Sequence, residues 1–296
     1  MKYLKFLFLL ILFFTNSILA DDSSSTKQSI ISNITNSLAV GLQNVIGGEG
    51  DTEVAIATGE DYKPEISIMT VRPLTVHPGV DAWFVQLQFN ETKIRGKGRF
   101  SINTGIGYRK LSENNNSFTG ANLFIDYDEE GNARSSVGLE LRSSAFEALA
   151  NYYFPISNAQ SVNGYKERTL GGYEVSIIGE IPYIPWANIV ANHYEWSAEK
   201  NSKDLKGDKI SIELTLTPNF VVEGGMNDNN IDGNNNFLKA FFVFPGRENQ
   251  SASSKLIGEK AFSSDDMSLE LLSKVRRSNK QVIESEGTGV VMARAE

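Results

Sequence analysis

The sequence contains no cysteine and only two histidines, His77 and His193, among 296 residues. Disulfide bonds and cysteine-based zinc sites are therefore excluded, and two histidines so far apart do not predict a metal site. No long apolar run follows Phe14, which excludes a bundle of membrane-spanning helices. The formal net charge of −8 argues against a nucleic-acid surface. A hydrophobic content of 41% remains compatible with strands that are apolar only at every second position.

The N-terminus has the pattern of a secretory signal peptide over residues 1–20. Lys2 and Lys5 precede an apolar stretch, and Leu19-Ala20 forms a cleavage site before Asp21. The alternative is a single membrane anchor, which the shortness of the apolar stretch disfavours. Residues 21–52 then form a polar lead. Within it, apolar residues spaced by three and four predict an amphipathic helix over residues 28–46, with no clear choice between a packed periplasmic helix and a surface helix.

Residues 53–245 are dominated by alternation of polar and apolar side chains. In residues 210–217, isoleucine and leucine alternate with serine, glutamate and threonine, and residues 137–142 show the same two-residue period. Most segments have about ten residues, the length that a tilted strand needs to cross a bilayer. The twelve predicted strands are Glu53–Gly59, Glu65–Leu74, Asp81–Thr92, Arg99–Leu111, Phe118–Asp128, Ala133–Arg142, Phe146–Ile156, Gly172–Ile181, Ala187–Ser197, Lys209–Thr217, Phe220–Met226 and Phe237–Phe244.

The two faces of these strands distinguish a membrane barrel from a soluble sandwich, in which the polar face would meet bulk water. We expect an antiparallel transmembrane β-barrel with a polar lumen. The predicted lumen-facing residues are Glu140, Arg142, Glu174, Glu180 and Glu213. Tyr173, Val175 and Ile177 would face lipid instead. Aromatic girdles are predicted from Tyr152, Tyr183, Trp186, Tyr194 and Trp196, which lie near strand ends.

The connections between strands also differ in length. The long ones are residues 157–171, 198–208 and 227–236, and each follows an odd-numbered strand. In outer-membrane barrels, long loops face outward and short turns face the periplasm. The pattern therefore predicts that both ends of the barrel sequence are periplasmic, although the early odd hairpins are short.

Several motifs resemble the inverse autotransporters, the intimin and invasin family. They are Gly105-Ile106-Gly107-Tyr108-Arg109, then Gly120 to Asp128 and Ala150 to Ser157, within a likeness that covers roughly residues 32–245. The resemblance implies a twelve-stranded barrel in the Gram-negative outer membrane. It also implies a partly helical linker that leaves the last strand, threads outward through the pore and carries an adhesive passenger. Outer-membrane lipid, the barrel assembly machinery and periplasmic chaperones are the partners that we expect.

Residues 246–296 follow the barrel and are predicted to be this linker. Ser264, Asp265 and Asp266 favour a helix start, and apolar residues continue the helix until Arg276 and Arg277 close its last turn. Such a helix would span about 20 Å, close to the ~25 Å apolar height of a barrel. The residues that we assign to a pore-threading helix are Asp265, Met267, Leu271, Val275 and Arg276; the alternative is a periplasmic helix. Short extended pieces are predicted at Gln281–Ile283 and Val290–Met292.

The sequence indicates no enzyme, cofactor or metal. His193 has no nucleophile motif near it, and the acidic residues Asp126, Asp128, Glu129 and Glu130 lack calcium-loop spacing and are interpreted as a solvated turn. We expect an outer-membrane translocator and anchor with no recognisable passenger, so its receptor is unknown. The alternative function is a small outer-membrane pore or structural barrel whose tail acts as a gate or lies in the periplasm.

Overall fold

The computed structural model describes residues 49–59, 62–94, 97–200, 203–246, 250–286 and 289–292. The predicted signal peptide and the helix predicted over residues 28–46 lie outside this part of the chain. None of the helical segments in the described part has the length and hydropathy of a transmembrane span.

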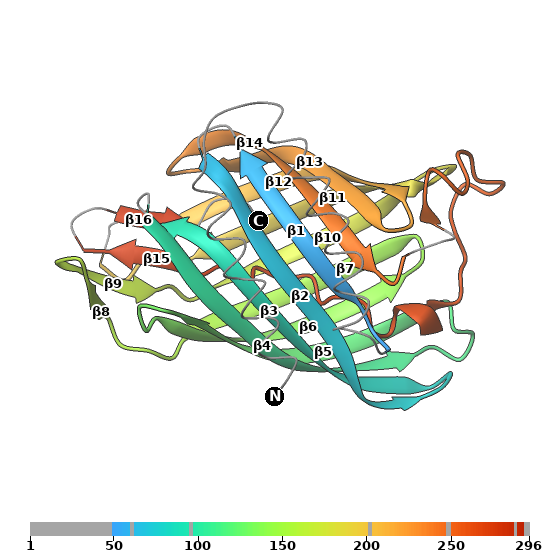
Figure 1. The fold of residues 1–296 in the computed structure, drawn as a ribbon, viewed down its shortest axis with the longest axis horizontal. Coiled ribbons are helices and arrows are strands. Elements are labelled where there is room, and N and C mark those ends of the chain that lie inside the picture. Colours follow the sequence, from blue (N-terminus) through green and yellow to red (C-terminus); the bar gives the residue numbers. More distant parts are fainter. Residues whose placement is uncertain are drawn as a thin grey trace, which may run out of the picture. The chain divides into compact units, whose positions relative to one another are not determined.

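Within the described residues, twelve strands pair in sequence order and close into one antiparallel barrel, as predicted (Figure 1). Its strands are β1 (Thr52–Gly59), β2 (Tyr62–His77), β3 (Asp81–Ile94), β4 (Lys97–Leu111), β5 (Ser117–Asp128), β6 (Ala133–Ser143), β7 (Phe146–Pro155), β10 (Gly172–Ile181), β11 (Ile184–Trp196), β12 (Leu205–Thr217), β13 (Phe220–Asn229) and β14 (Gly233–Phe244). The first and last strands close the ring, with Thr52 opposite Phe244 and Gly59 opposite Phe237. Closure leaves no open sheet edge, which is what a sheet inside lipid requires.

The side chains of each strand alternate between the outside and the lumen. In β5, Leu123, Ile125 and Tyr127 are exposed on the outside, whereas Phe124 and Asp126 are buried. The same alternation recurs in β6, where Leu139 is 67% exposed and its neighbour Glu140 is 4% exposed. An apolar outside and a polar inside are the reverse of a water-soluble barrel, and they match a barrel surrounded by acyl chains.

The two ends of the barrel differ. We call one rim the turn end: it holds residues 78–80, 112–116, 144–145, 182–183 and 218–219, together with the start of β1 and the end of β14. The opposite rim is the loop end, which holds the longer connections 156–171 and 197–204.

A second, four-stranded sheet lies at the loop end, in the order β16-β15-β9-β8. Its strands β8 (Gln160–Val162) and β9 (Tyr165–Thr169) come from the connection after β7. The strands β15 (Val282–Ser285) and β16 (Gly289–Met292) come from the tail, so the short extended pieces predicted there are confirmed. The sequence did not predict the β8–β9 hairpin.

Two of the predicted girdle residues lie inside the barrel instead. Tyr194 and Trp196 are buried with Tyr153, Leu170 and Val282 in one apolar cluster. Their positions have the same parity as Val190 on β11, whose side chain is also buried, whereas Ile189 is exposed. Whether a side chain faces lipid or the lumen is therefore predicted better by its alternation along the strand than by its nearness to the strand end.

Candidate functional site: the tail inside the barrel

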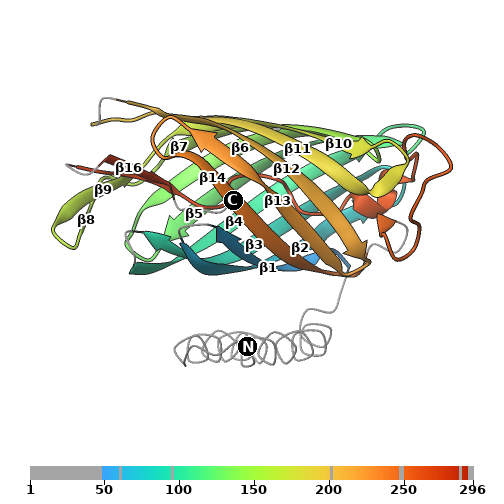
Figure 2. The same cartoon turned by 90° about the horizontal axis from the view of Figure 1, so that it is seen from above.

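The chain leaves β14 and follows the rim of the turn end. Ala252 donates its backbone N–H to the Thr215 carbonyl at 2.8 Å, and Gly258 donates to the Tyr183 carbonyl at 2.8 Å. Ser263 then donates to a Glu180 carboxylate oxygen at 2.9 Å. The tail thus crosses the turn after β12, then the turn after β10, before it turns into the barrel (Figure 2).

Inside the mouth of the turn end, Met267 and Leu271 pack in a cluster with Ala82, Leu111 and Phe118. A 3₁₀ helix, η2 (Met267–Glu270), forms here. Its N-cap is Asp266, whose carboxylate accepts the Ser268 N–H at 2.8 Å. This hydrogen bond lowers the pKa of Asp266. The predicted helix start is therefore correct to within a residue.

The long helix predicted over Ser264 to Arg277 is wrong beyond this single turn. Residues 271–281 after η2 form turns, bends and irregular backbone, and wall side chains donate hydrogen bonds to their backbone carbonyls. The carbonyl of Lys274 accepts from Arg142 at 2.8 Å, that of Arg276 from Asn151 at 3.2 Å, and that of Ser278 from Arg134 at 2.7 Å. A helix satisfies its own carbonyls, but here the polar lumen satisfies them, so the chain can cross the pore without forming a helix.

Arg109 organises the half of the lumen nearest the turn end. Its Nη1 donates to the carbonyls of Leu271 at 2.9 Å and Ser273 at 2.6 Å. Its Nε donates to Glu140 at 2.7 Å, and the guanidinium lies 4.5 Å from the centre of the Phe84 ring. Arg109 is fully buried and is held by Glu140 and by the Phe84 and Phe118 rings while it binds carbonyls of the tail. Gly107 leaves room for the Phe84 ring, since a Cβ there would lie 2.2 Å from it.

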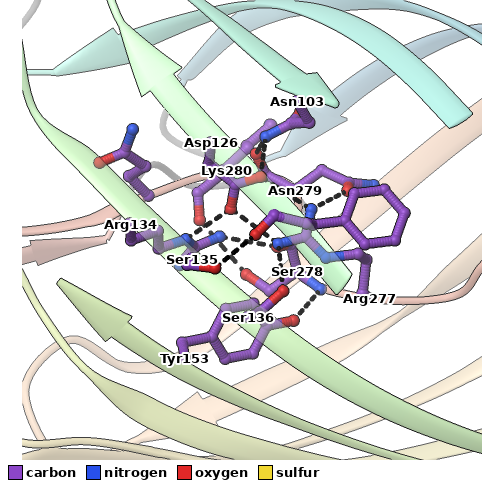
Figure 3. A network of polar contacts seen from close by, with 12 residues as sticks. Asn103, Asp126, Arg134, Ser135, Ser136, Tyr153, Arg277, Ser278, Asn279 and Lys280 are labelled. Atoms are coloured by element: carbon purple, nitrogen blue, oxygen red, sulfur yellow. Dashed lines mark hydrogen bonds and ion pairs between the residues drawn. The ribbon is translucent and has the colours of Figure 1, made fainter. Parts of the chain in front are cut away.

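A second network lies deeper in the lumen (Figure 3). The buried carboxylate of Asp126 accepts from Arg134 on β6 at 2.8 Å and from Arg277 of the tail at 2.7 Å. Asn103 donates to the same carboxylate at 2.7 Å and to the carbonyl of Asn279 at 2.8 Å. One anion therefore serves a cation of the wall and a cation of the tail, and its neighbours hold the tail backbone.

Tyr153 and Glu174 complete this network. The Tyr153 hydroxyl donates to Glu174, and both accept the backbone N–H of Ser278, at 2.8 Å and 2.6 Å respectively. The Tyr153 ring faces two cations, with the Arg134 guanidinium at 4.5 Å and the Arg277 guanidinium at 5.3 Å. The tail is thereby held through its backbone as well as through its side chains.

Each tail cation from Lys274 to Lys280 meets an acid of the wall. Three distances are 2.6 Å for Lys274 to Glu53, 2.9 Å for Arg276 to Glu213 and 2.7 Å for Arg277 to Asp126; Lys280 pairs with Glu65. These acids belong to β1, β12, β5 and β2, so the ion pairs radiate to different sides of the barrel. A cavity of about 210 Å³, lined in part by β12, β13 and β14, remains beside the tail.

At the loop end, the tail joins the second sheet. Ile283 lies opposite Thr169, and Glu284 lies opposite Arg168 in the β15–β9 pairing. Arg168 bonds Glu199 at 2.7 Å and Glu286 at 2.8 Å. The hydrogen bond to Glu199, with the charges of Glu199 and Glu284 and the hydrogen bond to Glu286, raises the pKa of Arg168. The segment from residue 267 to residue 281, which we call the pore segment, therefore runs from one mouth of the barrel to the other (Figures 1 and 2).

The residues that the sequence assigned to the lumen are all buried on the inner face. They are Glu140, Arg142, Glu174, Glu180 and Glu213, and each has a contact with the tail or with a residue that contacts it. Of the residues assigned to the tail helix, Met267, Leu271 and Val275 are buried against wall residues. Arg276 lies in the lumen, whereas Asp265 is exposed at the rim.

The residues that hold the tail most directly were not recognised from the sequence pattern. The sequence predicts Arg109 only as part of a family-like motif and Arg277 only as the end of a helix, and it predicts no role for Arg134. Asp126 was wrongly interpreted as part of a solvated turn, although it is fully buried. Parity was the signal that could have found it, because Asp126 has the phase of Asn122 and Phe124, whereas Ile125 faces outward.

The two histidines are separate and each bonds an aspartate. His77 contacts Asp81 at 2.6 Å, and His193 contacts Asp208 at 2.8 Å. Among the described residues, no three or more acidic or histidine side chains are grouped so that they could hold a metal ion.

Comparison with solved structures supports the barrel fold. One solved structure, described as "Unveiling the Mechanism Behind the in-meso Crystallization of Membrane Proteins", matches with a TM-score of 0.65 and 20% identity, over 81% of this chain and 100% of that one. The KdgM porin in complex with disordered oligogalacturonate matches with a TM-score of 0.45 and 6% identity, over 65% of this chain and 98% of that one. The outer membrane protein Omp33 of Acinetobacter baumannii matches with a TM-score of 0.40 and 10% identity, over 66% of this chain and 98% of that one. No curated protein matches the sequence.

The closed fold, apolar outside and polar lumen define a transmembrane β-barrel of the outer membrane. The model of the inverse autotransporter beta-domain family matches residues 15–278, so this chain belongs to that family. The family is not an enzyme family. The chain is therefore a translocator and anchor located in the Gram-negative outer membrane, and lipid surrounds its barrel.

Proposed function

We propose that the pore segment is a linker that closes the barrel and leads the chain from the periplasm to the cell surface. The turn end then faces the periplasm, and the loop end faces outward. The role is non-enzymatic: wall and tail hold each other, and any polypeptide beyond β15 is displayed outside.

One observation carries this proposal. The four cations of the pore segment pair with acids on β1, β12, β5 and β2, while arginines of the wall bind the tail carbonyls. If the tail lay in the periplasm, these buried charged groups of the wall would lose their partners in the tail. Buried charges are costly unless they are paired, so this lumen is suited to hold this tail.

Insertion of the barrel requires partners of its own. We propose that the barrel assembly machinery recognises β14, whose last residues Phe242 and Phe244 repeat an aromatic at every second position. Periplasmic chaperones would hold the unfolded strands, since these expose alternate apolar residues until the ring closes.

The orientation can be tested with single cysteines, because the native chain has none. Glu286→Cys lies at the loop end and Glu113→Cys lies in the turn after β4. We expect a membrane-impermeant maleimide to label Glu286→Cys on intact cells and to label Glu113→Cys only after the outer membrane is permeabilised. The reverse order would contradict the orientation, and protection of both sites would contradict outward threading.

The cavity of about 210 Å³ beside the tail favours a second candidate, a small pore that the tail gates. Deletion of residues 263–296 separates the two functions in planar bilayers. If the tail is a plug, the full chain is nearly silent and the deletion gives a steady current, because the lumen of an emptied barrel fills with water. A steady current from the full chain that the deletion leaves unchanged would contradict the plug and favour the pore.

A further inference from the structure

Residues 250–263, which we call the rim segment, are fixed to the outer rim of the turn end. Ser253 donates its backbone N–H to the Leu216 carbonyl of β12 at 3.2 Å. Farther along, Gly258 donates to the Tyr183 carbonyl at 2.8 Å, and Tyr183 donates in return to the Ala261 carbonyl at 2.8 Å. The segment is thus attached at two separate points of the barrel and has a defined position.

The rim segment presents apolar side chains outward. Leu256 is 68% exposed and Ile257 is 74% exposed, although both lie between the two attachment points. Phe262 is also half exposed. A long flexible loop could hide such residues by collapsing, but backbone hydrogen bonds on both sides keep Leu256 and Ile257 turned away from the protein. Their exposure therefore calls for a covering surface.

The lipid-facing surface of the barrel reaches the same place. The outward row of β12 runs through Ile210 and Ile212 to Leu216, whose carbonyl binds the rim segment. Trp186 donates its indole N–H to the Leu256 carbonyl at 3.0 Å, and Tyr183 is half exposed beside it. Tryptophan and tyrosine at strand ends mark the level of the lipid headgroups, so Leu256 adjoins that level.

Charged residues flank the apolar pair in a way that suits a headgroup layer. Lys255 and Lys260 are both exposed, one before Leu256-Ile257 and one after it. Lys255 forms an exposed ion pair with Glu259 at 3.6 Å. Lysines can lie at the surface of a bilayer while neighbouring apolar side chains enter it.

We propose that the rim segment is an interfacial lipid anchor, in which Leu256 and Ile257 insert among the phospholipids of the leaflet at the turn end. The anchor fixes the height at which the tail leaves the rim and enters the mouth. This inference rests on the membrane location of the barrel, and it holds whether or not the tail threads to the cell surface.

Depth-dependent quenching in phospholipid liposomes tests the proposal with the full chain. Ile257→Cys is labelled with an environment-sensitive fluorophore, and the liposomes contain lipids with a nitroxide high or low on the acyl chain. Interfacial side chains are buried by about 5–10 Å. We therefore expect the Ile257→Cys label to lose emission to the shallow nitroxide more than to the deep one.

Two matched sites calibrate the result. Leu139→Cys lies on the outward face of β6 and should be quenched by nitroxide lipids, whereas Glu113→Cys, in another turn of the same rim, should remain unquenched. If the label at Ile257→Cys remains unquenched, like the label at Glu113→Cys, the lipid anchor is overturned. Because the liposomes need no cell-surface display, failure of the threading proposal would leave this outcome unchanged.

Discussion

An Asp126→Ala variant is expected to expose the pore segment on the order of 10²–10³ times more often than the unaltered chain does. Asp126 is fully buried, and its carboxylate is shared by Arg134 of the wall and Arg277 of the tail. Without it, two buried guanidinium groups lose their common anion. Removing one partner of a buried ion pair costs about 3–5 kcal/mol. Each step of about 1.4 kcal/mol changes the equilibrium between the closed and open states tenfold.

A thiol at Val275→Cys can report this opening. Val275 is 2% exposed in the native lumen, where it packs with Met69, Phe84 and Phe124. Cysteine is a small hydrophobic residue and suits that cluster. In liposomes, the rate of reaction with a charged thiol reagent follows the fraction of time for which the pore segment leaves its place.

Two comparisons make the Asp126→Ala result specific. Arg277→Met should have the smaller effect, because Asp126 then still pairs with Arg134 and methionine can pack against the Phe124 ring. Glu195→Ala removes an ion pair with Lys206 on the outer face and should leave the rate unchanged, since exposed pairs contribute about 0–1 kcal/mol. If Arg277→Met raised the reaction rate of Val275→Cys more than Asp126→Ala does, Asp126 would not be the shared anion that holds the tail.

The number and order of the strands could be predicted because every strand must meet lipid on one side. That requirement writes a two-residue period into the sequence, as in Ile210 and Ile212 of β12. The ends of the strands were harder to predict. The ladder of β14 begins at Gly233 rather than Phe237, and Asn235 pairs with Asn227 across it. Beyond the apolar band, a strand needs only backbone hydrogen bonds, so asparagines continue it without any apolar alternation.

The conformation of the tail could not be predicted from its own residues. Asp266 and the apolar residues at 267, 271 and 275 favour a helix in isolation, and only η2 forms. Arg109 and Arg134, which are far away in sequence, provide the donors that bind the tail carbonyls. Local propensity lost to these tertiary hydrogen bonds, because a buried carbonyl is satisfied equally well by a fixed guanidinium group.

The pairing of charges is the second property that only the structure shows. Sequence parity indicates that Glu213 faces inward, but it does not say which cation this residue meets. Lys274 meets Glu53, which is distant in sequence, because the tail crosses the lumen in one register. That register leads to a test by exchange of charges.

Lys274→Glu is expected to raise the reaction rate of Val275→Cys by roughly 10²-fold, because two carboxylates then face each other beside the tail and like charges in contact cost several kcal/mol. Glu53→Lys alone should act similarly, since it opposes Lys274 with a second ammonium group. The double variant restores an ion pair with its two charges exchanged. We expect it to return the rate to within about tenfold of the unaltered chain.

The restoration should remain incomplete for a reason that the structure supplies. Lys274 Nζ lies 4.5 Å from the centre of the Phe241 ring, and a carboxylate in that place loses the attraction between cation and ring. This attraction contributes about 0.5–2 kcal/mol when it is shielded from water. Phe241→Leu should therefore speed the reaction of Val275→Cys in the unaltered background and speed it less in the exchanged pair.

A mismatched exchange decides whether the register itself is fixed. Lys274→Glu combined with Glu65→Lys keeps the same total charge, but Glu65 pairs with Lys280, so neither change meets its complement. If the tail is held by these individual pairs, the mismatched variant should react faster than Lys274→Glu alone. Equal rescue by the matched and mismatched exchanges would mean that the tail is held by the mean charge of the lumen and can slide. In that case the ion pairs would not define where the tail stops.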